Sequence, residues 1–256
     1  MSAPLFSIIL PTFNAAATIR EAVHSVLSQS FGDFELLIQD GGSSDGTLDG
    51  LPSDERIKAV AAQDKGVYDA MNRALARATG EWVYILGADD RLMDPDVLEH
   101  VAAGLTDLDV LYGDVVSPRW ESRYNGEFDA LKIGDCNICH QALFVRRTLY
   151  ARLGGFDLRY PVLADWHLNM RWFFDPSVRH RWVDRVIAHY GDRGLSSTQS
   201  GDAFLGEKAE MHFRLAGKKL PKDRRRHYLR EFGLRDLRGG HALRGLRELA
   251  EYVLSR

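Results

Sequence analysis

Short β-rich runs and amphipathic helical segments alternate through the first 90 residues of the chain. The sequence predicts strands at 6–10, 34–38, 57–61 and 82–86, with one helix opening at Thr18 and another over 66–78. Parallel strands need a long crossover between them, usually a helix. The β-α-β-β-α-β order therefore predicts an α/β fold with a mostly parallel central sheet flanked by helices. Further strands are expected at 109–113 and 182–188, and further helices at 147–153 and 165–174.

Clusters of polar residues follow the predicted strands or precede a predicted helix. They lie at 12–14, 40–45, 64–66 and 89–90. In open α/β sheets, ligands bind outside the carboxyl ends of the strands. We therefore expect the four clusters to converge on one site at this edge of the sheet. The irregular stretch from the end of the 109–113 strand to about residue 139 is expected to cover the same face.

The glycine-rich turn at 41–46 does not match the common phosphate-binding loops. It lacks the Lys-Ser/Thr ending of the Walker pattern and the glycine spacing of the dinucleotide fingerprint. Asp40 precedes it, and a carboxylate there can accept hydrogen bonds from a base N–H or from ribose hydroxyls. The alternative is a turn without a binding role.

Three carboxylates in two other segments suggest chemistry. Asp89 and Asp90 are adjacent and repel one another, which a hard divalent cation such as Mg²⁺ or Mn²⁺ would offset; capping of the following turn is the alternative. Asp165 lies where a helix begins, and the helix dipole keeps a carboxylate there ionised, as a general base must be; N-cap duty is the alternative. The neighbouring Trp166 offers a flat ring on which a sugar could pack.

The segment Cys136-Asn137-Ile138-Cys139-His140 matches the C-x-x-C-H pattern of haem attachment and half of a zinc site. Haem attachment requires export, for which the sequence shows no signal peptide, and a zinc site requires a second ligand pair, which the sequence does not show at comparable spacing. Two reduced cysteines are therefore the better interpretation. The apolar run at 5–10 ends at Pro11, far short of the roughly 20 residues needed to cross a bilayer, and the first residues lack the basic region of a signal peptide. We expect a cytoplasmic protein.

Charge is distributed unevenly along the 256 residues. Between Arg214 and Arg247, twelve Lys or Arg stand against three acids, a net +9, whereas the rest of the chain carries −12. We therefore expect residues 1–202 to form one domain and 203–256 a basic helical C-terminal extension. The extension would contact an anionic membrane or form a solvated helix face. Nucleic acid is not expected, because few aromatic residues are interleaved with the cations.

Five segments, taken together and in order, resemble the family 2 glycosyltransferases, which have the GT-A type of fold. They are Leu10-Pro11-Thr12-Phe13-Asn14, then 39–47 (QDGGSSDGT), 64–72 (DKGVYDAMN), 78–90 (ATGEW to GADD), and Gly154-Gly155-Phe156-Asp157 followed by Ala164-Asp165-Trp166. The second and third segments are similar to the branch that acts in bacterial surface-polysaccharide assembly.

The resemblance implies roles for individual residues. Asp165 would be the catalytic base, and Asp90, with His189 as second ligand, would hold Mn²⁺ or Mg²⁺. The chain departs from the family pattern at Ala88, where the D-x-D motif has its first acid, and at Ala164, before the base. The residues implied to bind the nucleotide-sugar are Pro11, Thr12, Asn14, Asp40, Asp64, Lys65, Gly66, Asn72 and Asp89.

The implied function is an inverting, metal-assisted glycosyltransferase. It would move a sugar from a nucleoside-diphosphate sugar to a hydroxyl of a saccharide acceptor, which a lipid carrier could hold at the inner face of the plasma membrane. His140, Gln141 and Trp166 are the acceptor-binding candidates, and the loop 191–200 is expected to close over the substrates. Two alternatives stay open. A nucleotidylyltransferase would need a basic loop after the first strand, and a nucleotide-binding module would not use Asp165 catalytically.

Overall fold

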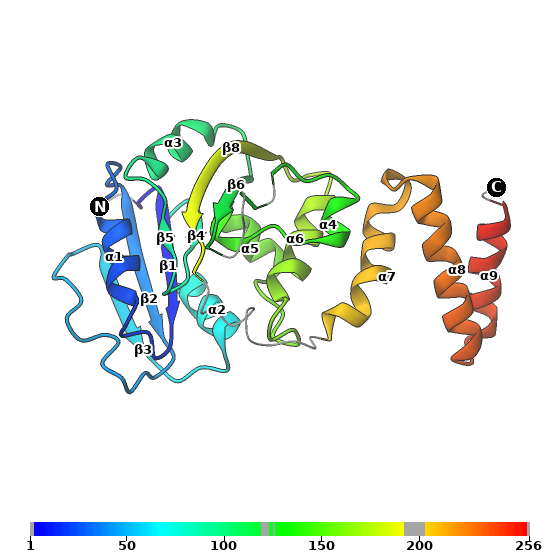
Figure 1. Ribbon diagram of the computed structural model, residues 1–256, viewed down its shortest axis with the longest axis horizontal. Coiled ribbons are helices and arrows are strands. Elements are labelled where there is room, and N and C mark those ends of the chain that lie inside the picture. The colour runs from blue at the N-terminus through cyan, green and yellow to red at the C-terminus, as the bar shows by residue number, and fades with distance from the viewer. Residues whose placement is uncertain (1–2, 119–122, 125, 192–202, 255–256) are drawn as a thin grey trace.

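A twisted sheet forms the centre of the protein in the computed structural model, which describes residues 3–118, 123–124, 126–191 and 203–254 (Figure 1). Within these residues the sheet has eight strands in the order β3-β2-β1-β4-β7-β6-β8-β5. Only β5 and β7 run against the others. The strands are β1 Phe6–Thr12, β2 Phe34–Asp40, β3 Ile57–Ala61, β4 Trp82–Ile85, β5 Arg91–Leu92, β6 Val110–Val116, β7 Leu143–Arg146 and β8 His180–His189.

Helices cover both faces of the sheet. One face carries α1 (Ile19–Leu27) and α3 (Val97–Gly104), and the other carries α2 (Val67–Arg77), α5 (Arg147–Leu153) and α6 (Ala164–Phe174). Because β1 is buried on both sides, its apolar residues divide between two cores: Ile8 and Leu10 face α1, and Ile9 faces α2. The mostly parallel, helix-flanked α/β fold predicted from the sequence is confirmed.

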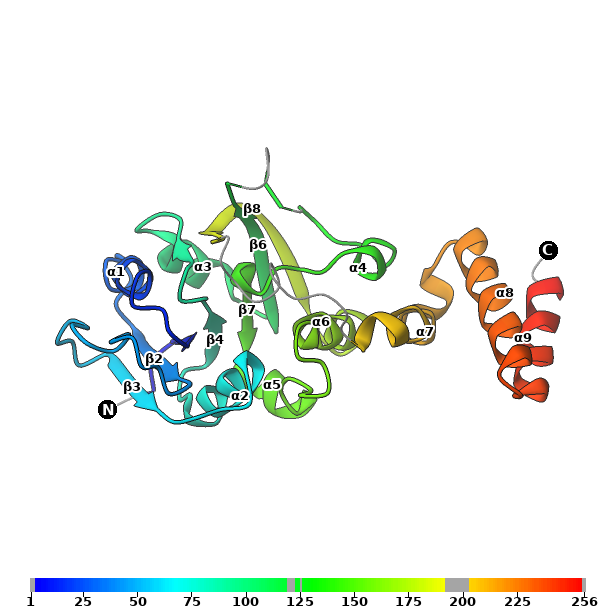
Figure 2. The same cartoon turned by 60° about the horizontal axis from the view of Figure 1, so that its bottom comes forward.

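The C-terminal helices extend away from the sheet (Figures 1 and 2). They are α7 (Phe204–Ala216), α8 (Lys222–Arg238) and α9 (Ala242–Leu254), and the short α4 (Lys132–Asp135) lies beside α7. Phe204 and His212 of α7 are fully buried against the body, so this helix belongs to its core. In contrast, α8 and α9 pack mainly against each other. They approach closely at Gly233, where a Cβ atom would lie only 2.6 Å from the side chain of Leu249.

Candidate active site

A cleft of about 1050 Å³ opens at the carboxyl ends of β1 and β4. The start of α2, the turn after β4, the 3₁₀ turn His140–Ala142 and the start of α6 complete its walls. Eleven of the residues predicted for the site line this cleft, although they come from distant parts of the sequence. They are Pro11, Thr12, Asn14, Asp64, Gly66, Asp89, Asp90, His140, Gln141, Asp165 and Trp166.

Asp165 is the second residue of α6, and its side chain is nearly buried at the cleft wall. Its Oδ1 lies 2.9 Å from the hydroxyl of Tyr68 and accepts the backbone N–H of Trp166 at 2.8 Å. Its Oδ2 lies 3.1 Å from Nδ1 of His140. The N-cap position of the helix is Leu163, so Asp165 is not the N-cap residue, although its carboxylate satisfies one free N–H of the first turn, that of Trp166. The carboxylate is therefore held both by the start of its own helix and by Tyr68 and His140 of the cleft.

Asp90 lies deeper, in the turn after β4, and is 3% exposed. Its Oδ2 accepts hydrogen bonds from the Gly87 N–H (3.0 Å) and from Nε2 of Gln141 (2.7 Å), and its Oδ1 accepts the Gly191 N–H (2.7 Å). Burial and the neighbouring Asp89 raise the pKa of Asp90, and these hydrogen bonds offset the effect only in part. A cation beside the two carboxylates would relieve this cost.

The donor atoms at Asp89 and Asp90 suit a hard divalent cation that brings part of its own coordination shell. Within the described part of the chain, no group of three or more His, Cys, Asp or Glu could hold a metal ion alone. Mg²⁺ is commonly bound by one or two carboxylates together with substrate phosphates and water. The two aspartates fit that mode of binding, and His189 does not line the cleft.

The opposite side of the cleft is shaped by two glycines and Asp64. Oδ1 of Asp64 accepts a hydrogen bond from the N–H of Gly66 at 2.9 Å. Gly66 is the N-cap residue of α2 and has a φ of 118°. A Cβ at Gly41 would lie 2.7 Å from Oδ2 of Asp64, so a larger residue at position 41 would displace the Asp64 carboxylate. The turn after β2 and the start of α2 therefore form one continuous wall.

Family relationships agree with this geometry. The family model described as "Glycosyl transferase family 2" matches residues 7–155. The chain belongs to this family. It is 45% identical over 215 residues to a "PGL/p-HBAD biosynthesis glycosyltransferase" of Mycobacterium bovis, which covers 80% of this chain and 84% of that protein. The family 2 chain is thus a glycosyltransferase.

Two further similarities are more limited. The chain is 44% identical over 93 residues to the "Putative teichuronic acid biosynthesis glycosyltransferase TuaG" of Bacillus subtilis, across 34% of this chain and 37% of that protein. Its fold matches the crystal structure of S. aureus TarS 1-349 in complex with UDP-GlcNAc, with a TM-score of 0.68 and 20% identity. That match covers 100% of this chain and 81% of TarS 1-349. The GT-A-like fold of this family 2 chain is therefore confirmed.

Four residues predicted for the site do not line the cleft, namely Asp40, Lys65, Asn72 and His189. The Asp40 carboxylate closes the turn after β2, because it accepts the N–H groups of Gly42 (2.9 Å) and Ser43 (2.8 Å). The Asn72 amide binds the backbone N–H and C=O of Phe156, both at 2.9 Å. In this family 2 chain, Asp40 and Asn72 thus position the loops that surround the cleft.

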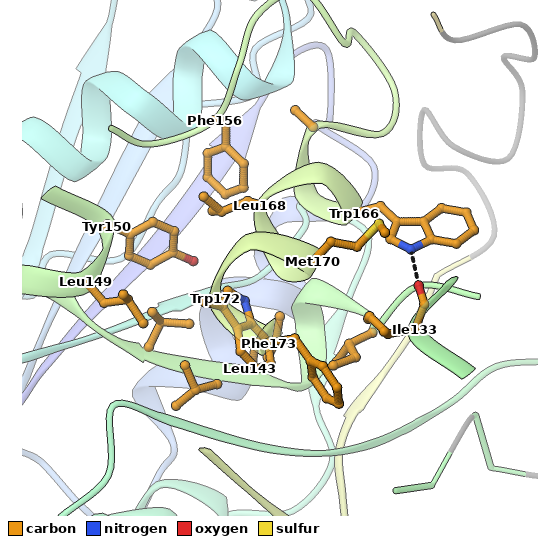
Figure 3. Packing of buried hydrophobic residues seen from close by; sticks show 14 of the residues in the cluster. Ile133, Leu143, Leu149, Tyr150, Phe156, Trp166, Leu168, Met170, Trp172 and Phe173 are labelled. Atoms are coloured by element: carbon orange, nitrogen blue, oxygen red, sulfur yellow. Dashed lines mark hydrogen bonds between the residues drawn. The ribbon is translucent and has the colours of Figure 1, made fainter. Parts of the chain in front are cut away.

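The acceptor candidates differ in what their side chains already contact. The Gln141 side chain is buried, and both ends of its amide have partners. Its Nε2 donates to Asp90, and its Oε1 accepts a hydrogen bond from Sγ of Cys139 at 2.8 Å. The indole N–H of Trp166 donates to the carbonyl oxygen of Ile133 at 2.7 Å (Figure 3). The ammonium of Lys208 lies 4.0 Å from the Trp166 ring centroid and so covers one face of the indole.

Sequence reasoning missed four aromatic residues that line the cleft, namely Phe13, Tyr68, Tyr124 and Tyr190. Tyr68 touches Asp165, and its hydroxyl also lies 2.7 Å from the carbonyl oxygen of Val162. A signal for Tyr68 was present, because it stands in the 64–72 segment of the family pattern, two residues after Gly66. Of the loop predicted at 191–200, residues 192–200 lie outside the described residues.

Proposed function

We propose that this glycosyltransferase moves a sugar from a nucleoside-diphosphate sugar to a hydroxyl of a saccharide acceptor, with inversion at the anomeric carbon. The observation that carries the proposal is that Asp165 and the pair Asp89 and Asp90 face one cleft at the carboxyl ends of the strands. A single base and a separate site for the leaving group suit one direct displacement. Residues 1–202 would carry this chemistry.

The donor would bind between the end of β1, the start of α2 and the turn after β4. The wall for the nucleobase and ribose of the donor is supplied by Pro11, Thr12, Asn14, Asp64 and Gly66. Asp40 and Asn72 would act through the loops that they hold, and Asp89 would face the sugar or ribose. Lys65 is exposed beside this wall, from where it could reach the diphosphate.

Asp90, together with Asp89, would hold Mn²⁺ or Mg²⁺ against the diphosphate. A bound divalent ion would neutralise negative charge on the departing nucleoside diphosphate. His189 remains a second-ligand candidate on sequence grounds only. In the protein itself, the Gly87 and Gly191 N–H groups and Gln141 keep the Asp90 carboxylate in place.

Asp165 would act as the general base. Its carboxylate takes the proton of the acceptor hydroxyl while the hydroxyl oxygen forms the new bond to the anomeric carbon. The bond from that carbon to the diphosphate breaks on the opposite face, and its electron pair leaves with the nucleoside diphosphate. The hydrogen bonds from Trp166 and His140 hold the carboxylate for this transfer.

The two alternatives are weaker in this setting. A nucleotidylyltransferase needs cations near the end of the first strand to hold a triphosphate, and the segment 11–17 that borders the cleft contains none. A nucleotide-binding module without catalysis would leave Asp165 without a chemical role. Membership of the glycosyltransferase family favours the transfer reaction over both.

We further propose that the acceptor belongs to a cell-surface polysaccharide and is presented on a lipid at the inner face of the plasma membrane. The similarity to TuaG supports the polysaccharide. The cations of 203–256 and the exposed Leu243 and Leu246 of α9 support contact with an anionic leaflet. No helix in the described part of the chain is long and apolar enough to span a membrane.

The decisive experiment combines Asp165→Asn with a thermal-shift panel of UDP, GDP, dTDP and CMP, each with and without Mn²⁺. At about 100 times its Kd, the correct nucleotide should stabilise the protein by roughly 2.7 kcal/mol. Asp165→Asn should keep this shift and lose about 10²- to 10⁴-fold in turnover. The exposed Asp107→Asn is the matched control. Wild-type turnover in Asp165→Asn would exclude this base, and no shift with any nucleotide would favour the binding module.

A further inference from the structure

His140 and Asp165 meet at the wall of the cleft although 25 positions separate them in the sequence. Nδ1 of His140 lies 3.1 Å from Oδ2 of Asp165, and the two side chains are 22% and 10% exposed. A carboxylate only accepts hydrogen bonds, so a favourable contact at this distance requires the proton on Nδ1. His140 is thereby the donor, and Asp165 the acceptor.

His140 makes the contact at Oδ2 of Asp165, and the other contacts of this carboxylate are at Oδ1. Oδ1 is occupied by Tyr68 and by the Trp166 N–H. Behind the pair lies a space of only about 10 Å³, too small for more than one water molecule. Its other walls are mainly apolar side chains, among them Leu143, Leu149, Tyr150, Phe156, Leu168 and Trp172 (Figure 3).

The second ring nitrogen of His140 faces a different environment. Nε2 has no hydrogen-bond partner among the residues that the structure describes, and it is not one of their buried, unsatisfied atoms. His140 also lines the main cleft. With the proton on Nδ1, Nε2 carries a lone pair that can accept a hydrogen bond from a hydroxyl in the cleft.

We propose that His140 is a positioning residue for the base. With its proton on Nδ1 the ring donates to Asp165, which fixes the carboxylate, and its Nε2 accepts a hydrogen bond from a second hydroxyl of the acceptor. The acceptor is then a sugar with two hydroxyls close together, one bound by each residue. This inference rests on the proposed function for the role of Asp165.

The neighbouring residue makes the same kind of contact on the other carboxylate. Gln141 donates to Oδ2 of Asp90 at 2.7 Å, just as His140 donates to Asp165. Both residues belong to the same 3₁₀ turn, His140–Ala142. One short turn therefore contacts both the proposed base and the carboxylate proposed for the metal.

The first test is the tautomer of His140, measured by ¹⁵N NMR of histidine-labelled protein without ligand. The His140 signals are assigned by their loss in His140→Asn. We expect the ring to carry its proton on Nδ1 alone. A proton on Nε2 alone would overturn the proposal because Nδ1 could not donate to Asp165, and a ring protonated on both nitrogens would overturn it because Nε2 could not accept a hydrogen bond. This result does not depend on whether Asp165 is the base.

The second test separates the two nitrogens by substitution. The amide of Asn can replace the Nδ1–H donor, whereas the longer Gln places its amide near the position of Nε2. The assay uses water as the acceptor and measures the rate at which UDP is released from UDP-GlcNAc, or from the sugar nucleotide that matches the thermal-shift result. In His140→Asn this rate should stay within about threefold of the wild-type rate. It should fall about tenfold or more in His140→Gln, because a misplaced base is costly.

The matched control is His100→Asn on the exposed surface of α3, which should leave turnover unchanged. Equal losses in His140→Asn and His140→Gln would show that His140 is only a packing residue and would overturn the proposal. If Asp165→Asn keeps full turnover, the proposed base fails, and the NMR result still stands for the His140 contact alone.

Discussion

Glu35 is a buried carboxylate whose ionisation should account for a measurable part of the folding free energy. It is the second residue of β2 and is 3% exposed. Its Oε1 accepts the hydroxyl of Ser7 (2.6 Å) and both the N–H (2.7 Å) and hydroxyl (2.8 Å) of Thr79, and its Oε2 accepts Nζ of Lys58 (2.6 Å). The side chain thus joins β1, β2, β3 and the turn that leads into β4.

The size of the effect follows from the pKa of Glu35. Burial raises this pKa, but the hydrogen bonds from Lys58, Ser7 and Thr79 outweigh burial and lower it from 4.5 to about 2. A difference of this size between the unfolded and folded states corresponds to roughly 3 kcal/mol of stability. Because the folded-state pKa is lowered, this stability is fully present well above pH 4.5 and is lost as the pH falls toward 2. About 0.8 kcal/mol should be gone at pH 4 and about 2 kcal/mol at pH 3.

The assay is urea unfolding of wild type and Glu35→Gln between pH 7 and pH 3. Gln keeps the shape and much of the hydrogen bonding but cannot ionise. The variant should be less stable than wild type by up to about 3 kcal/mol at pH 7, and the gap should narrow below pH 4.5 as calculated. The exposed Glu55→Gln is the matched control and should show little difference. A gap that does not change with pH would refute the reasoning.

Two further predictions concern the C-terminal helices. Gly134→Ala would place its methyl group 2.1 Å from the ring of His212 and should lower the free energy of unfolding by about 1 to 3 kcal/mol, measured by thermal unfolding. Gly206→Ala is the control: it has open space around it in α7 and should raise the free energy of unfolding by up to about 1 kcal/mol. Equal effects of the two substitutions would contradict the packing described. The protein should sediment with anionic vesicles at low salt but not with neutral ones, and Leu246→Glu should weaken this; equal sedimentation with both vesicle types, or with neither, would exclude the electrostatic contact.

Much of the sheet could be predicted because its strands have a local signal. The runs at 6–10, 34–38 and 82–86 are mostly apolar, each with at most one polar residue, and the strands that they form are buried on both faces. Strands β5 and β7 lack such a signal. The first has two residues, and the second, Leu143–Arg146, continues into α5 without any turn residue between them. Their pairing is decided by tertiary contacts with β8, β4 and β6.

The site could be predicted as a set of polar clusters but not as a set of roles. Asp40 and Asp64 both precede glycine-containing turns, and each can either bind a ligand or close its own turn. In the folded chain both carboxylates accept an N–H of their own turn, but Asp64 also lines the cleft, whereas Asp40 is 1% exposed and does not. The residue type is the same in both roles, so only the three-dimensional position separates them.

The contact between His140, Gln141 and the two carboxylates shows why this limit matters. In the sequence, these two residues stand next to a C-x-x-C pair that suggests a metal or redox motif. In the fold, they hold Asp165 and Asp90, which come from helix α6 and from the turn after β4. The proposed direct displacement requires its base and its leaving-group site to be held at a fixed separation. One short turn that contacts both carboxylates would provide this, and that role depends on long-range contacts that no local pattern encodes.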